Sequence, residues 1–137
     1  MNKTAPNIII FTCNWDGLSS IEAASQAGYC YPSSVKMVRV SCLSRIHRGL
    51  IIKAFELGAD GVMLLGCEPG NCHFETDAGL IEQEYENARS LLKLLGLREE
   101  RLILAHIPQG DGYGFMTQLT CFITELEQMR PALPVRA

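Results

Sequence analysis

Hydrophobic residues along this chain form short continuous runs that alternate with longer segments of helical periodicity. The continuous runs are residues 7–13, 34–42, 59–67 and 101–108. Such runs, rich in β-branched residues, are typical of strands buried on both faces of a parallel sheet. Lys36 and Arg39 interrupt the second run, which indicates a strand nearer the edge of the sheet.

The segments that follow these runs have the periodicity of helices. They cover approximately residues 18–27, 50–57, 79–95 and 115–129. Ser19 and Glu22 have the spacing of a capping box, which predicts a helix start near residue 18. In the second helix Leu50, Ala54 and Leu57 form the apolar stripe with which an amphipathic helix packs on a core. The glycine-rich residues 110–114 are expected to form a flexible turn.

This alternation of strands and helices predicts the α/β class. We expect an open parallel sheet of about four strands, flanked by helices on both faces and joined by right-handed crossovers, as in flavodoxin-like and Rossmann-like folds. The chain shows no internal repeat or composition break, so residues 1–137 are interpreted as one domain. Its core spans about residues 6–129, and residues 130–137 form a loose tail.

Composition and charge exclude several classes of function. A hydrophobic content of 47% supports a packed core, and a net charge of −3 gives no electrostatic footprint for nucleic acid. No apolar run reaches the roughly 20 residues that span a membrane, and the N-terminus does not resemble a signal peptide. We therefore expect a cytoplasmic protein, in which six cysteines indicate metal or redox chemistry rather than disulfides.

Three of these cysteines end successive strand-like runs. Cys13, Cys42 and Cys67 close the first three runs, and Cys72 follows Cys67 after the turn sequence EPGN. Binding sites in open parallel sheets form beyond the carboxyl ends of the strands, so these thiols are expected to converge. Four convergent thiolates suit a metal ion or an iron–sulfur cluster. We predict Cys13, Cys42, Cys67 and Cys72 as the ligands.

The spacing of the four cysteines favours iron–sulfur over zinc. Zinc sites with four thiolates usually contain two CxxC pairs, and this chain has none. A 2Fe–2S cluster is therefore the preferred cofactor. Three alternatives stay open: a dithiol oxidoreductase that uses Cys67 and Cys72, a zinc-binding or metal-free docking protein within a redox complex, and buried structural cysteines.

The other residues whose side chains could take part in chemistry give weaker indications of function. Cys121, inside the last predicted helix, is expected in the core, and Cys30 is interpreted as a loop thiol outside the site. Trp15 is interpreted as a shield for a cluster, an anchor for a partner protein or a packing residue. The chain contains no Ser-His-Asp set, paired catalytic carboxylates or HExxH motif. An electron carrier needs none of these, so we expect a non-catalytic role.

The segments CNW, YPSSVKMVRVSC and GCEPGNCH identify a family resemblance. The chain resembles the delta subunit of methyl-viologen-reducing hydrogenase from about Pro6 to Met129, most specifically over residues 58–73. The resemblance implies a 2Fe–2S cluster. It also implies electron transfer from a hydrogenase or formate dehydrogenase to the flavin-bearing A subunit of heterodisulfide reductase, in complexes that bifurcate electrons. Cys13, Cys42, Cys67 and Cys72 match cysteines of that family.

The chain departs from the family at one position. The family usually reads CNWC, whereas this chain reads CNWD, with Asp16 in place of the second cysteine. Two interpretations follow: that cysteine is not a ligand in the family, or the cluster here is lost, altered or bound through Asp16. We favour the first, because four matched cysteines remain and four are needed.

Overall fold

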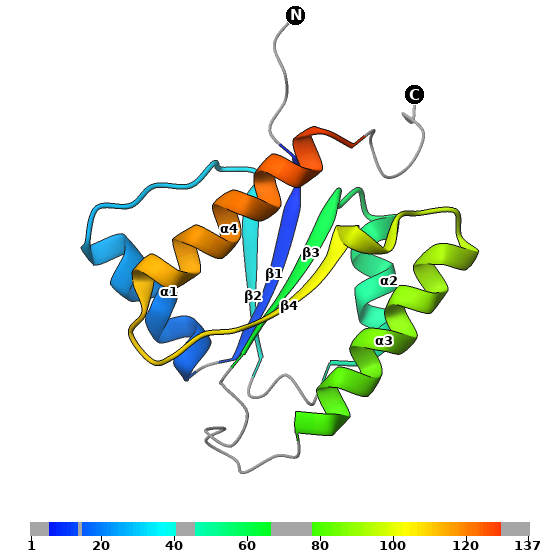
Figure 1. The fold of residues 1–137 in the computed structure, drawn as a ribbon, viewed down its shortest axis with the longest axis horizontal. Helices are drawn as coiled ribbons and strands as arrows, with labels where there is room; N and C mark the ends of the chain where they lie inside the picture. Colours follow the sequence, from blue (N-terminus) through cyan, green and yellow to red (C-terminus); the bar gives the residue numbers. More distant parts are fainter. Residues whose placement is uncertain (1–5, 14, 41–45, 67–77, 130–137) are drawn as a thin grey trace, which may run out of the picture.

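The computed structural model describes residues 6–13, 15–40, 46–66 and 78–129, in which strands and helices alternate along the chain (Figure 1). The predicted tail, residues 130–137, lies outside the described residues. No described helix is long and apolar enough to cross a membrane. The elements are β1 (Ile8–Cys13), α1 (Asp16–Gln26), β2 (Val35–Val40), α2 (Arg48–Glu56), β3 (Gly61–Gly66), α3 (Ala78–Leu94), the 3₁₀ turn η2 (Glu99–Arg101), β4 (Leu102–His106) and α4 (Gly112–Glu127).

The strands form one parallel sheet in the order β2-β1-β3-β4, which confirms the predicted α/β class. The chain moves outward from β1 to β2 and then returns past β1 to β3. With right-handed crossovers, this reversal places α1 and α2 on opposite faces, and α3 lies on the same face as α2 because the chain continues in the same direction to β4. Helices α1 and α4 cover one face, and α2 and α3 cover the other (Figure 1). Strand β2 lies at an edge, as its two charged residues predicted.

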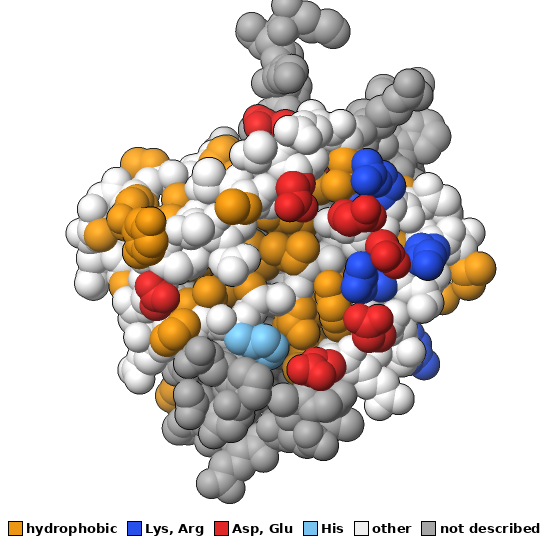
Figure 2. Space-filling view, in the orientation of Figure 1, with side chains coloured by type: hydrophobic (Ala, Val, Ile, Leu, Met, Phe, Trp, Pro, Cys, Tyr) orange, Lys and Arg blue, Asp and Glu red, His pale blue; other side chains and the backbone are white. Residues whose placement is uncertain are grey.

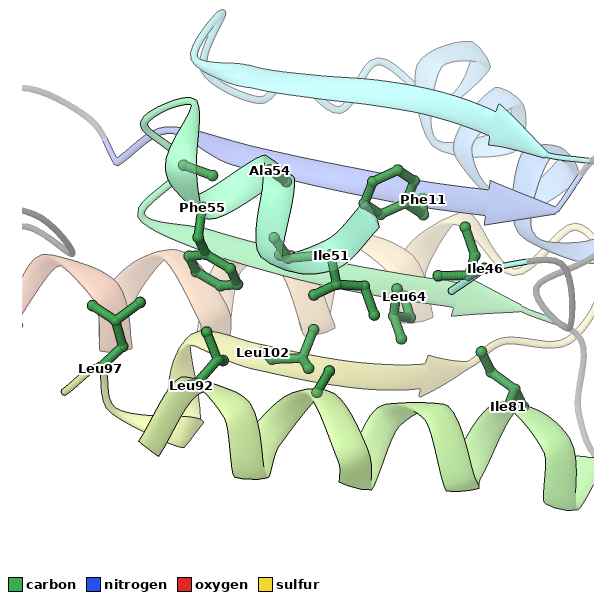
Figure 3. Packing of buried hydrophobic residues seen from close by; sticks show 13 residues of the cluster. Phe11, Ile46, Ile51, Ala54, Phe55, Leu64, Ile81, Leu92, Leu97 and Leu102 are labelled. Atoms are coloured by element: carbon green, nitrogen blue, oxygen red, sulfur yellow. The ribbon is translucent and has the colours of Figure 1, made fainter. Parts of the chain in front are cut away.

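Alternate side chains of the strands pack into two hydrophobic cores, one on each face of the sheet. Phe11, Val62 and Leu64 belong to the core beneath α2 and α3, and Figure 3 shows its labelled side chains gathered between these helices and the sheet. Ile10 and Met63, one position away, belong to the core beneath α1 and α4. All six residues of β3 are buried, because helices cover both of its faces. Burial of each large apolar side chain contributes about 1.5–3 kcal/mol.

Two glycines bring α4 close to its neighbours. A Cβ atom on Gly61 would lie 2.5 Å from Leu126 Cδ1 and 2.7 Å from Phe122 Cζ. A Cβ atom on Gly112 would lie 2.5 Å from the backbone nitrogen of Ala24 in α1. Neither distance is compatible with an unshifted side chain, so glycine at both positions allows α4 to seal its face of the sheet.

Helix α1 begins earlier than the sequence pattern predicted. Its first residue is Asp16, its N-cap is Trp15, and no side chain caps it. The capping box of Ser19 and Glu22 is therefore wrong: Ser19 lies inside the helix, and its Oγ accepts a hydrogen bond from the Gly110 backbone N–H at 2.9 Å. A tertiary contact thus uses the hydroxyl that the local pattern assigned to a cap.

Helix α4 also begins before the expected residue. Residues 112–114 belong to its first turn rather than to a flexible loop. Asp111 is the N-cap, and its carboxylate accepts a hydrogen bond from the Gly114 N–H at 2.8 Å. An N-cap carboxylate satisfies a helix-start N–H, which stabilises a helix despite glycines in its first turn.

Two of the three residues in the apolar stripe predicted for α2 do not face the core. The buried residues of α2 are Ile51, Ala54 and Phe55, which pack toward β3 and α3. Leu50 and Leu57 from the predicted stripe are 44% and 77% exposed. Two apolar stripes that share Ala54 overlap on this helix, and the tertiary structure buries the one that the periodicity did not select.

Charged residues of both signs lie over α3 and η2. Figure 2 shows acidic and basic side chains intermixed on this part of the surface. Arg89 pairs with Glu99 at 3.1 Å, and Lys93 contacts the other carboxylate oxygen of Glu99 at 3.7 Å. Exposed pairs of this kind contribute at most about 1 kcal/mol each, so they neutralise this surface more than they stabilise the fold.

Candidate functional site

Three neighbouring strands end together at the carboxyl edge of the sheet. Cys13, the last residue of β1, lies opposite Val40, the last residue of β2. On the other side Thr12 lies opposite Leu65, one residue before the end of β3 at Gly66. In the sequence Cys42 follows Val40 by two residues, and Cys67 follows Gly66 directly. The carboxyl ends of β1, β2 and β3 are therefore adjacent. Convergence of the four thiols stays a prediction, because Cys42, Cys67 and Cys72 lie outside the described residues.

Cys13 is buried beside the start of α1. Its side chain is 3% exposed, and its Sγ accepts a hydrogen bond from the Gly17 backbone N–H at an N···S distance of 3.2 Å. Gly17 is the second residue of α1, so this N–H belongs to the positive end of the helix dipole. A backbone N–H at a helix start is the kind of donor that hydrogen-bonds to the sulfur ligands of metal centres.

Gly17 packs directly against the ends of two strands. A Cβ atom at this position would overlap Thr12 Oγ1 and would lie 2.9 Å from the Leu65 carbonyl oxygen. Only glycine therefore lets the first turn of α1 approach close enough to donate its N–H to Cys13. This residue was not among those predicted from the sequence. Its signal was a glycine four residues after a strand-end cysteine, at the start of a helix.

The segment after β4 completes the described part of this edge. The Ile107 N–H donates to the Gly66 carbonyl oxygen at 3.0 Å, which extends the β3–β4 pairing past the end of β4. The Gly110 N–H donates to Ser19 Oγ in α1. These bonds hold the start of α1 and the end of β3 in one framework around Cys13.

Comparison with known protein families assigns the chain to one of them. Residues 8–130 match the family described as methyl-viologen-reducing hydrogenase, delta subunit. The chain belongs to this delta-subunit family. The match includes all the described strands and helices, so the family assignment covers the whole fold rather than one motif.

Curated relatives of this delta-subunit chain carry two kinds of name. It is 33% identical over 126 residues to the iron-sulfur D subunit of the F420-non-reducing hydrogenase of Archaeoglobus profundus, covering 92% of both chains. It is 32% identical to the vhc iron-sulfur D subunit of Methanococcus voltae, covering 92% of this chain and 88% of the relative. It is 28% identical to the A subunit of the ferredoxin:CoB-CoM heterodisulfide reductase of Methanosarcina mazei, covering 92% of this chain but 16% of that protein.

The other cysteines of this delta-subunit chain lie away from the carboxyl edge. Cys121 is exposed on α4, so its predicted place in the core is wrong. Cys30 is exposed in the segment between α1 and β2, as expected of a loop thiol. Both therefore serve as controls for the cysteines at the strand ends.

Two aromatic residues near helix starts have defined surroundings. Trp15 is the N-cap of α1, two residues after Cys13, and is 40% exposed. His47 is the N-cap of α2, and its Nδ1 accepts a hydrogen bond from the Gly49 N–H at 3.0 Å. His73 lies outside the described residues. Trp15 thus places a partly exposed apolar side chain two residues from Cys13 in the sequence.

The donor chemistry at Cys13 fits an anionic metal centre. Its buried sulfur, with a backbone N–H donor and a helix N-terminus beside it, is the environment that thiolate ligands of clusters require. Among the described residues, no three His, Cys, Asp or Glu side chains lie close enough to hold a metal ion. Cys13 is the one predicted ligand within that part of the chain.

Proposed function

We propose that this protein is a non-catalytic electron-transfer subunit that holds a 2Fe–2S cluster through Cys13, Cys42, Cys67 and Cys72. The observation that carries this proposal is the environment of Cys13. Its buried sulfur accepts a hydrogen bond from a backbone N–H at the start of α1. It lies at the edge where the neighbouring strands β2 and β3 end, and in the sequence Cys42 and Cys67 follow these two strands. The iron–sulfur names of the related hydrogenase subunits are consistent with it.

The chain's own residues tune the site through hydrogen bonding and exclusion of water. A 2Fe–2S cluster, when bound, supplies one-electron chemistry. The Gly17 N–H stabilises charge on Cys13 Sγ, and the packing of Gly17 against Thr12 and Leu65 excludes water from this side of the sulfur. The partly exposed Trp15 next to this edge supplies an apolar surface for a partner protein.

The proposed partners are a hydrogenase or formate dehydrogenase module as donor and the flavin-bearing A subunit of heterodisulfide reductase as acceptor, in a bifurcating complex. Two findings support this pair. Relatives over nearly the whole chain are named hydrogenase subunits. A stretch similar to 92% of this chain also occurs within the A subunit of a heterodisulfide reductase. A stretch that is part of the A subunit in one organism is expected to contact the A subunit when it occurs as a separate chain in another organism.

Metal and sulfide analysis tests the cofactor. Anaerobically purified protein should contain iron and acid-labile sulfide in near-equal amounts, and chemical reduction should produce the paramagnetic resonance signal of a reduced 2Fe–2S cluster. Zinc without sulfide would replace the proposal with a zinc-binding docking subunit. Absence of both metals would replace it with a metal-free one.

Cysteine substitutions test the ligands. Cys13→Ser, Cys67→Ser and Cys72→Ser should each abolish or severely destabilise the cluster, because serine is a poor ligand for iron in place of a thiolate. Cys121→Ser is the matched control, because this thiol is exposed on α4. Loss of iron and sulfide in the Cys121→Ser variant would refute the ligand assignment.

Asp16 is proposed to lower the reduction potential of the cluster. A carboxylate near an anionic cluster disfavours the added electron, since like charges repel. Replacement of Asp16 by the cysteine usual in the family should therefore raise the potential measured by redox titration. A potential equal to or below that of the wild type in the Asp16→Cys variant would count against this role.

A further inference from the structure

An open groove lies between helix α2 and the edge strand β2. Its volume is about 480 Å³. Ile9 and Phe11 of β1, with Lys36 and Val38 of β2, line it from the sheet. Leu50, Lys53, Ala54 and Leu57 line it from α2 and its C-cap. The groove is therefore a stretch of sheet face with a helix along one side.

The groove exists because α2 turns its buried side away from β2. Ile51 and Phe55 pack into the core shared with β3 and α3 (Figure 3). The second stripe of α2 is left at the groove, where Leu50 is 44% and Leu57 is 77% exposed. Val38 of β2 is also 40% exposed. Leu50, Ala54 and Leu57 recur at i, i+4 and i+7, the spacing with which one helix packs against another.

The groove carries positive charge that the described residues do not neutralise. Lys36 and Lys53 are both exposed and both line it, and none of the described residues that line it carries a carboxylate. Within the described part of the chain neither lysine forms an ion pair, whereas Lys93 on α3 contacts Glu99. An apolar groove flanked by two unneutralised lysines is complementary to an apolar stripe flanked by carboxylates.

We propose that this groove binds an amphipathic α-helix of a partner protein, whose apolar stripe is flanked by Asp or Glu. A helix with side chains is about 10 Å across, so one laid beside α2 would continue its layer over β2. An added strand would pair with the outer edge of β2 instead and would leave Leu50 and Leu57 uncovered. A second copy in a two-fold contact would bring the lysines of both grooves together, which is unfavourable.

The groove is separate from the cysteine edge. Asn7, Gly58 and Ala59 line its far end, and they precede β1 and β3 at the amino edge of the sheet. Cys13 lies at the opposite, carboxyl edge. Cys13 is not among the residues that line the groove, so failure of peptide binding leaves the electron-transfer proposal untouched.

Peptide binding to the full-length protein tests the proposal. The probe is a fluorescent helical peptide of about 18 residues, with leucines at i, i+3, i+4 and i+7 and glutamates beside them. We expect saturable binding by anisotropy that weakens about tenfold or more in Leu57→Asp, because an apolar contact is replaced by a charge that repels glutamate. Leu94→Asp on α3 is the matched control at an 82% exposed leucine and should bind as the wild type does.

A charge exchange decides whether the lysines select the partner. The Lys36→Glu/Lys53→Glu variant should bind the glutamate peptide about tenfold more weakly and should instead bind the same peptide with lysines in place of glutamates. Iron and sulfide contents should be the same in all variants. No saturable binding of the glutamate peptide, or equal loss in Leu94→Asp, would overturn the proposal. A wild-type dimer in sedimentation that Leu57→Asp dissociates would overturn it in favour of a second copy.

Discussion

The two faces of the sheet are closed in different ways. On the face covered by α1 and α4, Gly112 brings α4 against the backbone of Ala24, and Gly61 lies beneath Leu126. On the other face α2 and α3 pack on β3 and β4, and the side of α2 nearest β2 keeps Leu50 and Leu57 exposed. The first face is complete within one chain, whereas the second leaves apolar surface at its margin.

Because of this difference, substitutions on one face are expected to change the stability of the fold, and substitutions of the exposed leucines are expected to change partner binding. Tight contacts through glycine leave no room for additional atoms, so substitutions on the α1–α4 face are expected to destabilise the fold. Exposed leucines contribute little to folding, so the cost of changing them is expected in association with a partner. The face of a residue, rather than its hydrophobicity, therefore predicts which measurement will change.

The largest contrast is expected within α2 itself. Ile51 is fully buried and Leu57 is 77% exposed, although both are large aliphatic residues. Ile51→Ala should lower the free energy of unfolding by about 2–5 kcal/mol, because it leaves a cavity in the core. Leu57→Ala should change it by less than about 0.5 kcal/mol. Urea denaturation measures both, and equal losses would show that the groove side of α2 contributes to folding.

A smaller loss is expected where α1 and α4 meet. Gly112→Ala places a methyl group 2.5 Å from the Ala24 backbone nitrogen, so one of the two helices must shift. We expect the free energy of unfolding to fall by about 1–3 kcal/mol, the usual cost of overpacking. Gly49→Ala is the comparison and should cost less, because its new methyl group would meet the His47 imidazole, with Nδ1 at 3.1 Å, rather than backbone atoms. A neutral Gly112→Ala variant would show that this face is less tightly closed than its geometry indicates.

The sequence predicted the sheet well because the strands are local and strongly patterned. Each strand lies within its expected run. The clearest is β3, which is buried on both faces and is apolar throughout. Lys36 and Arg39 correctly indicated the edge, because a strand in the middle of the sheet has no room for two solvated cations. The carboxyl ends of the strands, and therefore the position of Cys13, followed from the same pattern.

The parts that failed depend on contacts between distant residues. Ser19 matched a cap, but Gly110, 91 residues away, uses its hydroxyl. The two stripes of α2 share Ala54, and only the position of α3 decides that Ile51 is buried and Leu50 is not. Gly17 was missed for the same reason. Part of its importance comes from the carbonyl oxygen of Leu65 in another strand, and the glycine four residues after Cys13 does not by itself reveal that contact.

Gly17 lets the comparison be tested at the carboxyl edge. Gly17→Ala should lower the free energy of unfolding by about 1–2 kcal/mol, because the new methyl group overlaps Thr12 Oγ1 and approaches the Leu65 carbonyl oxygen. It should also move the reduction potential, because displacement of α1 weakens the N–H···S hydrogen bond to Cys13. Gly49→Ala, at the second position of α2, is the control for both measurements. A potential equal to that of the wild type would remove Gly17 from the site.

The smallest contrast is between the caps of two helices on opposite faces. Asp111 caps α4 through a partly buried hydrogen bond to Gly114, whereas His47 caps α2 through an exposed one to Gly49. Asp111→Ala should lower the free energy of unfolding by about 1 kcal/mol, and Asp111→Asn by a few tenths, because asparagine is an equally good N-cap. His47→Ala should cost about 0.5 kcal/mol, since water satisfies an exposed N–H that loses its acceptor. Urea denaturation again measures these values. Equal losses for Asp111→Ala and His47→Ala would show that the capping energy does not depend on how tightly the surrounding face is closed.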